Sequence, residues 1–357
     1  MRPTYAEINL DAVAHNVATL ARLIEPSVVC TVVKADGYGH GDAPIANTAL
    51  MSGAKVLAVA LVEEGIRLRE AGIEAPILVL SEPGASAATA VAEWGLEPTV
   101  YSTDFAAALA ATGASLRVHV KLDTGMHRVG AAPDAVADVV AAIESASSLH
   151  LASLWTHFAV ADEDPDYTRT QIDRFDEVAG RFDVPTVHLA NTAGALLFPD
   201  SRRDMCRIGL GTYGLHPCDD TRGLVDLRPA MRLVTHVSHV QRLSAGERPS
   251  YGRVRALDHD SKVVTAPIGY ADGFWRRLTS EGRALIGGRE FSLAGTVTMD
   301  QIVVDVGEAD VALGDEVVLL GRQGDDEITA DEWAAKLGTI SYEVVCAIGP
   351  RVPRRYS

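Results

Sequence analysis

The sequence predicts an α/β protein, in which an N-terminal (β/α)8 TIM barrel precedes a C-terminal mostly β-strand domain. From residue 11 to about 215, short β-branched runs alternate with longer segments whose apolar residues recur every three or four positions. This alternation is typical of βαβ units. From Met231 to Leu320 the pattern changes to one strand-like run after another, separated by polar residues or glycine. The chain therefore divides into two parts of different architecture.

Eight candidate strands lie in the first part: Val28–Val33, Val56–Leu61, Ile77–Leu80, Thr99–Tyr101, Leu116–Lys121, Leu149–Trp155, Thr186–Ala190 and Arg207–Gly209. The clearest helical faces between and around them are Val13, Val17, Leu20 and Leu23, and Val136, Val139, Val140 and Ile143. Eight repeats in roughly 200 residues match the size of a (β/α)8 barrel. A doubly wound sheet is the alternative, but it usually carries a glycine fingerprint after its first strand. Here that strand ends in Lys34-Ala-Asp-Gly-Tyr38 instead.

The change of pattern falls near Asp226-Leu-Arg-Pro229, without a low-complexity linker. We therefore expect residues 1–227 to form the barrel and residues 228–357 to form the β domain. The second part has five candidate strands and one candidate helix: Val234–Leu243, Lys262–Ile268, Glu290–Val297, Ile302–Val306, Glu316–Leu320, and the helix Ala330–Leu337.

Composition excludes several classes of protein. The 357 residues carry 32 Lys and Arg against 48 Asp and Glu, a net charge of −16, so a nucleic-acid backbone would be repelled. No stretch approaches the ~18 apolar residues of a membrane span, and the N-terminus lacks the apolar run of a secretory signal. We expect a cytoplasmic protein without membrane or nucleic-acid partners. Its four cysteines are too scattered for a metal site and are expected to be reduced thiols: Cys30, Cys206, Cys218 and Cys346.

Polar residues at the carboxyl ends of the predicted strands are the candidate active-site groups, because the loops there build the active sites of barrels. Lys34 follows the first strand, and burial there would lower the pKa of a lysine and favour covalent chemistry with carbonyl compounds. An isolated lysine at a strand end more often only extends toward water. The other strand ends add further polar groups: Lys121, Asp123, Arg128, His157, His188, Asn191, Thr192 and Arg207. Any one of them can be an ordinary hydrogen-bonded strand end, but together they are expected on one rim.

The last two strand ends have the features of a phosphate site. Asn191 and Thr192 begin a helix, and Gly209-Leu-Gly211 follows the strand that Arg207 opens. Barrels commonly hold a phosphate with backbone N–H groups at this position, although a tight turn would use the same glycines. A lysine on one side of the rim and a phosphate site on the other indicate pyridoxal phosphate, whose aldehyde and phosphate lie on opposite sides of its ring.

Nine motifs run through the chain in order: Val33-Lys34-Ala-Asp-Gly-Tyr38-Gly-His-Gly41, Lys121-Leu-Asp-Thr-Gly-Met-His-Arg128, Thr156-His157-Phe-Ala, His188-Leu-Ala-Asn191-Thr192, Arg207-Ile-Gly209-Leu-Gly, Ser250-Tyr251-Gly252, Ile268-Gly-Tyr270-Ala-Asp272-Gly273, Thr298-Met299-Asp300-Gln301 and Thr339-Ile-Ser-Tyr342-Glu343. With them the chain resembles alanine racemase, a fold-type III enzyme that uses pyridoxal phosphate. The resemblance implies a homodimer that interconverts L-alanine and D-alanine and supplies D-alanine for peptidoglycan synthesis.

The resemblance also implies roles for individual residues. Lys34 would hold pyridoxal phosphate covalently and act as one of two acid/base groups. Tyr251 would be the other, reaching the active site of the partner subunit from the β domain. The residues that would contact the cofactor are Lys34, Tyr38, His157, Asn191, Thr192, Arg207, Gly209, Leu210 and Tyr342. Arg207 would face the pyridine nitrogen, while His157 and Arg207 would assist the tyrosine.

Substrate contacts follow from the same resemblance. Arg128 would face the phenolic oxygen of the cofactor beside the substrate, and Met299 would offer its backbone N–H to the substrate carboxylate. Tyr270 would line the entrance from across the dimer. Lys121 matches a lysine that is often carbamylated in the family and that positions Arg128.

Four departures from the family pattern affect these assignments: Gly37 replaces a usual alanine, His127 a usual glycine, Thr192 a serine, and Arg255 an aromatic residue. Two other functions were weighed. A single-domain, non-catalytic pyridoxal-phosphate carrier would lack the β domain, and a decarboxylase of this fold would carry a glutamate in place of Arg207. The choice of alanine over serine stays open, because a small pocket rejects one added hydroxyl only weakly.

Overall fold

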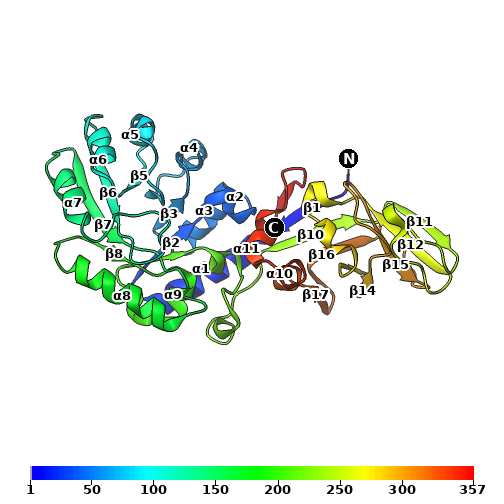
Figure 1. Cartoon of the computed structure of the whole chain (residues 1–357). Coiled ribbons are helices and arrows are strands. Elements are labelled where there is room, and N and C mark those ends of the chain that lie inside the picture. Colours follow the sequence, from blue (N-terminus) through cyan, green and yellow to red (C-terminus); the bar gives the residue numbers. More distant parts are fainter. Residues whose placement is uncertain (1) are drawn as a thin grey trace. The chain divides into compact units, whose positions relative to one another are not determined.

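The computed structural model describes residues 2–357, which form two compact units (Figure 1). The first, called the barrel unit here, comprises Asp11–Gly37 and Gly41–Arg228. The second, called the strand unit, comprises Pro229–Ser357, Tyr38–His40 and the described residues up to Leu10.

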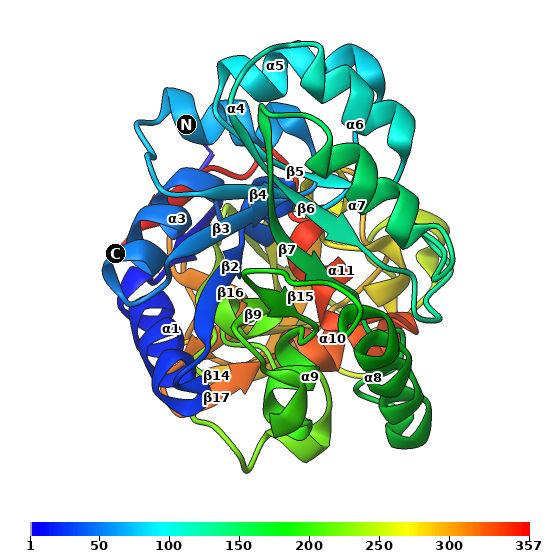
Figure 2. The ribbon, with the colours of Figure 1, turned by 90° about the vertical axis from the view of Figure 1, so that its left-hand side faces the viewer.

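The barrel unit contains eight parallel strands in the order β8-β7-β6-β5-β4-β3-β2-β9. Their bounds are β2 (Val28–Val32), β3 (Val56–Val59), β4 (Ile77–Val79), β5 (Glu97–Val100), β6 (Leu116–Lys121), β7 (Leu149–Trp155), β8 (Val187–His188) and β9 (Met205–Ile208). The two end strands approach each other, because the backbone N–H of Arg207 donates to the carbonyl of Ala190 at 2.9 Å. Figure 2 shows helices packed around the outside of these strands. The predicted (β/α)8 barrel is therefore confirmed.

The helices around the strands bury the faces that their spacing predicts. They are α1 (Leu10–Ile24), α3 (Asp42–Met51), α4 (Val62–Glu70), α5 (Ala88–Glu93), α6 (Thr103–Ala110), α7 (Val136–Glu144), α8 (Pro165–Ala179) and α9 (Thr192–Leu197). In α1, Val13, Val17 and Leu20 are buried, whereas Leu23 is only half-buried. All four predicted residues of α7 are buried. Apolar periodicity was thus sufficient to locate α1 and α7.

The strand unit is built mainly from two sheets. A seven-stranded sheet contains β1 (Tyr5–Ile8), β10 (Met231–His236), β13 (Arg283–Ile286), β14 (Arg289–Ser292), β16 (Glu316–Gln323), β17 (Asp326–Ile328) and β18 (Arg354–Tyr356). An antiparallel sheet contains β11 (His239–Leu243), β12 (Ser261–Ala266) and β15 (Ile302–Gly307). Two helices complete the unit, α10 (Ala330–Leu337) and α11 (Ser341–Cys346). The prediction of a mostly β-strand C-terminal domain is confirmed.

Two strand predictions in this unit were wrong in extent. The run Val234–Leu243 forms two strands, β10 and β11, that belong to different sheets. The chain changes sheets at Val237, whose N–H donates to Asp315, while the N–H of Ser238 donates to Thr265. The predicted strand Glu290–Val297 ends as β14 at Ser292. Apolar residues recur through both breaks, so the sequence pattern could not reveal the change of partner.

Five elements of the strand unit were not predicted: β1, β13, β17, β18 and α11. Strand β1 lies between β10, to which it is antiparallel, and β18, to which it is parallel. The first and last described segments of the chain are therefore neighbours in one sheet. Such short strands have too few residues for a periodic signal and are stabilised by partners far away in the sequence.

Candidate active site

Lys34 follows strand β2 and opens the segment α2 (Lys34–Tyr38), which has an unusual backbone. Residues 35–38 all have left-handed φ angles, between 51° and 58°. Such a conformation costs about 1–2 kcal/mol per L-residue, so consecutive left-handed residues need external support. Buried Glu64 supplies it by accepting the N–H groups of Ala35 at 2.7 Å and of Ala60 at 2.8 Å. Glu64 was not among the predicted site residues.

Lys121 ends strand β6 and is buried, with its ammonium nitrogen 4.7 Å from the ring centre of Trp155. Burial first, and then the nearby positive charges of Arg207, Arg128 and Lys34, lower its pKa to about 7 against the opposing charge of Asp123. Four cationic side chains therefore lie near one another in the barrel unit: Lys34 after β2, Lys121 and Arg128 at and after the end of β6, and Arg207 in β9.

Arg207 lies in strand β9 near its carboxyl end rather than at its start, where the sequence analysis placed it. The residue is only 2% exposed. Its guanidinium donates to Nδ1 of His188 at 2.8 Å and to the carbonyls of Thr156 at 2.7 Å and Leu189 at 2.8 Å. Burial lowers its pKa to about 10, so it stays protonated at neutral pH. Within residues 2–357, no carboxylate forms an ion pair with Arg207.

Two histidines and one tryptophan surround the guanidinium of Arg207. His157 and His188 are held neutral, because burial first and Arg207 second lower the pKa of each well below its usual value. Nδ1 of His157 lies 3.2 Å from the guanidinium. The ring of Trp155 lies 4.5 Å from the guanidinium carbon and stacks on His188 with centroids 5.4 Å apart. The sequence analysis missed Trp155, whose only signal was its position just before Thr156-His157.

The ends of strands β8 and β9 meet at Thr192. Its hydroxyl accepts the N–H groups of Gly209 at 3.2 Å and of Gly211 at 3.4 Å. Asn191 caps α9 by accepting the N–H of Gly194 at 2.8 Å, which confirms that Asn191 and Thr192 begin a helix. Backbone N–H groups, a hydroxyl and an amide therefore lie together where the sequence predicts a phosphate site.

The departure at His127 has a structural consequence. This residue has a left-handed φ of 54°, the conformation for which glycine is usual. Its N–H donates to Oδ1 of Asp123 at 3.0 Å and its ring lies 3.1 Å from Oδ2. The loop that leads to Arg128 is therefore tied to the carboxylate at the end of β6.

Leu210 begins the short helix Leu210–Tyr213 of the barrel unit, and the other remaining candidate residues lie in the strand unit. Tyr38 and Tyr342 face each other with ring centroids 6.2 Å apart, and burial raises the pKa of Tyr38 above its usual value. Tyr251 is 74% exposed on a turn in which Ser250 has a φ of 68°. Hydrogen bonds hold this turn: the Ser250 hydroxyl donates to the carbonyl of Thr296, whose own hydroxyl donates to the carbonyl of Tyr251.

The departure at Arg255 also belongs to this loop. Its guanidinium donates to the carbonyl of Leu293 at 2.6 Å, and it lies 3.9 Å from Asp305. A cation therefore fixes the loop beyond Tyr251.

Tyr270 and Met299 lie on two turns that are bonded to each other. The N–H groups of Tyr270 and Ala271 donate to the carbonyls of Thr298 and Met299 at 3.0 and 3.1 Å. A Cβ atom at Gly269 would lie 2.2 Å from the Thr298 oxygen, so only glycine permits this approach.

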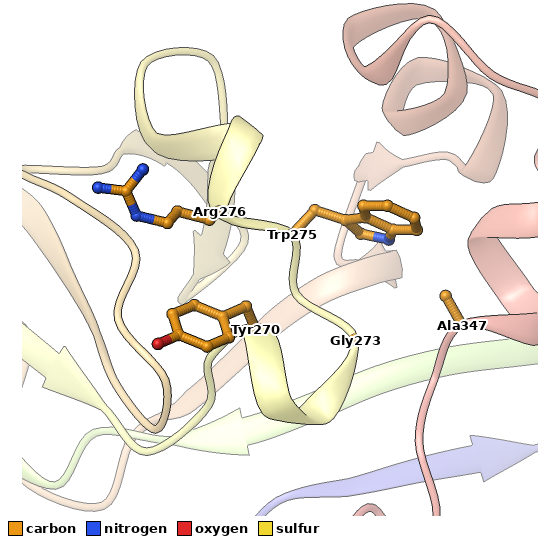
Figure 3. A pocket seen from close by; sticks show the side chains of 5 residues that line it. All are labelled: Tyr270, Gly273, Trp275, Arg276 and Ala347. Carbon is orange, nitrogen blue, oxygen red and sulfur yellow. The ribbon is translucent and has the colours of Figure 1, made fainter.

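Beside these turns is a cavity of about 400 Å³, lined by Tyr270, Gly273, Trp275, Arg276 and Ala347. Figure 3 shows the side chains of Tyr270 and Arg276 on one side of the loop and Trp275 on the other. Of these lining residues only Tyr270 was a predicted site residue, although Gly273 closes its motif and Trp275 and Arg276 lie just beyond it.

Neither a membrane-spanning helix nor a metal-binding cluster is found in the described part of the chain, residues 2–357. It contains no helix that is both long and apolar enough to cross a membrane. It also contains no group of three or more His, Cys, Asp or Glu residues that could bind a metal ion.

A (β/α)8 barrel with a lysine after its first strand, followed by a mostly β-strand domain, is the arrangement that the resemblance to fold-type III pyridoxal-phosphate enzymes implies. Family models agree: "Alanine racemase, N-terminal domain" matches residues 8–217 and "Alanine racemase, C-terminal domain" matches residues 230–356. The chain belongs to the alanine racemase family. It is a pyridoxal-phosphate-dependent racemase, an isomerase that interconverts L-alanine and D-alanine.

Individual relatives match over almost the full length. The alanine racemase of Symbiobacterium thermophilum is 43% identical over 100% of this chain and 97% of the relative. That of Frankia casuarinae is 42% identical over 98% and 95%. Among solved structures, alanine racemase from E. faecalis has a TM-score of 0.94 at 37% identity, covering 100% and 98% of the two chains. The Bacillus anthracis enzyme, solved with bound L-Ala-P, has a TM-score of 0.94 at 36% identity, covering 100% and 95%.

Proposed function

We propose that the chain racemises alanine with Lys34 and Tyr251 as its two acid/base groups, and that Lys34 binds pyridoxal phosphate covalently. The observation that carries this proposal is the cationic cluster of the barrel unit. Lys34, Arg128 and Arg207 are close enough to Lys121 to lower its pKa, against the opposing charge of Asp123. Such an excess of positive charge fits an anionic cofactor and an anionic substrate.

The donors of the barrel unit fit the polar groups of pyridoxal phosphate. Thr192, Gly209 and Leu210, with Asn191 beside them, would hold the phosphate, and Tyr38 and Tyr342 would add their hydroxyls. When bound, the cofactor stabilises the negative charge left on the substrate α-carbon after proton removal. Arg207 donates hydrogen bonds and keeps its protons, so it would leave the pyridine nitrogen unprotonated and limit side reactions.

Racemisation removes a proton from one face of the α-carbon and returns one to the other face, which two groups on opposite sides can do. The Lys34 amine would serve one face. The Tyr251 hydroxyl would serve the other in the partner subunit of a homodimer. Two observations support this role: Tyr251 is largely exposed in the single chain, and its turn is fixed by hydrogen bonds. An exposed side chain on a fixed turn suits a group that acts on another chain.

We also propose that Lys121 is carbamylated. A pKa of about 7 leaves much of its amine unprotonated near neutral pH, and only the unprotonated amine combines with carbon dioxide, releasing one proton. The carbamate anion would offset the charges of Arg128 and Arg207. Arg128 would then be positioned toward the phenolic oxygen of the cofactor.

Residues of the strand unit would contact the substrate. Met299 would donate its backbone N–H to the substrate carboxylate, and Tyr270 would line the entrance from the partner subunit. Residues 1–227 would bind the cofactor, and residues 228–357 would supply Tyr251. Within residues 2–357 no two cysteines form a disulfide, and we propose a cytoplasmic enzyme that makes D-alanine for peptidoglycan.

The test is incubation of the purified protein and pyridoxal phosphate with a panel of L-amino acids, followed by chiral separation. We expect D-alanine from L-alanine, and borohydride reduction should attach the cofactor to Lys34. If serine or a basic amino acid is racemised while alanine is not, the assignment of alanine is wrong. A label on another lysine would exclude the proposed role of Lys34.

A further inference from the structure

A continuous chain of hydrogen bonds crosses the interior of the barrel unit and ends at Arg207. Oε2 of Glu97 lies 2.7 Å from Nε2 of His119, whose Nδ1 lies 2.6 Å from the hydroxyl of Ser153. The same hydroxyl lies 2.9 Å from Nε2 of His188, whose Nδ1 lies 2.8 Å from the guanidinium of Arg207. These five residues are called the barrel relay here.

We propose that Glu97, His119 and Ser153 are positioning residues that act through His188 to hold the guanidinium of Arg207 in its working orientation. The inference rests on the proposed function, in which Arg207 faces the pyridine nitrogen. None of the three residues belongs to the motifs on which the site prediction was based.

The relay takes one residue from each of five neighbouring strands, β5 to β9. His119 is paired in register with Ser153. Side chains two positions apart in a strand point to the same face. His119 therefore shares a face with Lys121, and Ser153 shares one with Trp155. Glu97 is the first residue of β5, so the relay begins at the end of the barrel opposite the rim.

The two ends of the relay set the direction of every bond between them. A guanidinium can only donate and a carboxylate can only accept, and each of the three groups between them makes two relay bonds. With neutral imidazoles, Arg207 donates to His188, and His188 donates from Nε2 to Ser153. The serine hydroxyl then donates to His119, which donates from Nε2 to Glu97. Every group in this arrangement both donates and accepts, except at the ends.

The charges at the ends agree with this arrangement. Burial alone would raise the pKa of Glu97, but the hydrogen bond from His119, followed by the charge and hydrogen bond of Arg117, brings it below its usual value. Arg207 has no carboxylate as a direct partner, as described above, and its other acceptors are backbone carbonyls and His157. The relay thus connects a buried cation to a carboxylate without water, and hydrogen bonds in such chains polarise one another.

The relay residues between the ends are almost inaccessible to water, with His119 4% exposed, Ser153 1% and His188 0%. Loss of the serine hydroxyl would leave the Nε2–H of His188 without an acceptor in a place that water does not reach. The histidine would then turn or shift, and the guanidinium that donates to it would follow. Loss of the hydroxyl should therefore lower kcat and leave KM nearly unchanged, because no relay residue lies among those proposed to bind the substrate.

The test compares Ser153→Ala and Glu97→Gln with matched controls in the full-length protein. Ser115→Ala removes a serine–histidine bond of the same type, 3.0 Å long, to His150 of β7, but at an exposed place. Arg117→Gln removes the second partner of Glu97, bound at 3.0 Å through Oε1, and leaves the relay intact. Arg117 is 62% exposed on its side chain, so its replacement should not disturb packing.

Two readouts are needed. The first is the ring ¹⁵N resonances of His188 in histidine-labelled protein without cofactor. The second is kcat and KM for both alanine enantiomers, with the absorbance of the bound cofactor. For Ser153→Ala we expect shifted His188 resonances and a kcat lower by about tenfold, with KM within about twofold. Glu97→Gln should change both in the same direction by less, and the two controls should match the unsubstituted protein.

Unchanged His188 resonances and unchanged kcat in Ser153→Ala would overturn the inference. If that variant does not fold, Glu97→Gln decides, since its site lies at the partly exposed end of the relay. The proposed function fails separately: an unsubstituted protein that binds pyridoxal phosphate but does not racemise alanine would contradict it. The resonance test would still stand in that case, because it is read without cofactor or substrate.

Discussion

The candidate residues of the barrel unit and those of the strand unit differ in burial. Lys121 and Arg207 are buried and His157 is half-buried, and each contacts neighbours within the barrel unit. Tyr251 and Met299 are 74% and 51% exposed on turns of the strand unit. The barrel half of the site is therefore organised inside one chain, whereas the strand half presents reactive groups outward. This difference is what the proposed exchange of Tyr251 between subunits requires, and the following predictions test it.

The largest expected effect comes from the barrel side. Lys34→Ala should lower racemisation of both enantiomers on the order of 10³-fold or more, because it removes both the proposed base and the cofactor anchor. Chiral separation of the products measures this loss. Lys55→Ala, at an exposed lysine of the same unit, is the control and should keep full activity. Substantial activity in Lys34→Ala would contradict the proposed site.

The matching change on the strand side should be selective. Tyr251→Phe removes only the hydroxyl, so abstraction of the proton from one enantiomer should slow on the order of 10²-fold or more, while cofactor absorbance survives. Exchange of the α-hydrogen with deuterated water, measured from each enantiomer, separates the two directions. Tyr356→Phe, at another exposed tyrosine, is the control. Equal loss in both directions with an empty cofactor site would contradict the assignment.

A stability measurement tests how strongly the barrel site is desolvated. The pKa of Lys121 falls from 10.5 to about 7 on folding, so the unfolded chain binds more protons between these values. Stability should therefore rise with pH across this window, by on the order of 5 kcal/mol in total. Lys121→Met should flatten this slope and stabilise the cofactor-free protein at pH 7.

Urea unfolding in carbon-dioxide-free buffer at pH 7, 8 and 9 measures that slope. The exposed Lys55→Met variant should keep the slope of the unsubstituted protein. If Lys121→Met keeps it as well, Lys121 is not the group responsible.

The smallest effect concerns how firmly the exposed turns are held. Asp272 is fully buried, accepts the N–H of Gly269 at 3.0 Å, and pairs with Arg2 at 2.8 Å and Arg351 at 3.3 Å. Asp272→Ala should lower the free energy of unfolding by about 2 kcal/mol, because buried donors lose their acceptor. It should also raise KM more than it lowers kcat, since the turn of Met299 lies against this one.

Denaturant unfolding and steady-state kinetics check these two expectations. Asp300→Asn, at the exposed second partner of Arg351, is the control and should change stability little. An Asp272→Ala variant with unaltered KM would show that the Met299 turn does not depend on this carboxylate.

The sequence predicted most of the barrel because its strands and helices have strong local signals. The buried face of α7 and the ends of β6 and β7 came directly from apolar periodicity. Motif spacing was equally informative, since Lys34, Lys121 and Arg207 each stand near a strand end that the barrel brings to one rim. Short elements of the strand unit were not predicted, because a three-residue strand such as β18 is too short to show a hydrophobic period.

By itself, therefore, the sequence determined the barrel with its strand domain, the family and the chemical identity of the candidate groups. Only the tertiary structure decided that residues 35–38 adopt left-handed φ angles, next to a hydrogen bond from the Ala35 N–H to Glu64. It likewise decided that the predicted strand Val234–Leu243 divides between two sheets. It also decided that Glu97 and Ser153 join Arg207 in one chain of hydrogen bonds. The physical reason is that periodicity reports whether a residue is buried. Which distant residue a buried polar group meets depends on strand register and close packing, which arise only when the whole barrel closes.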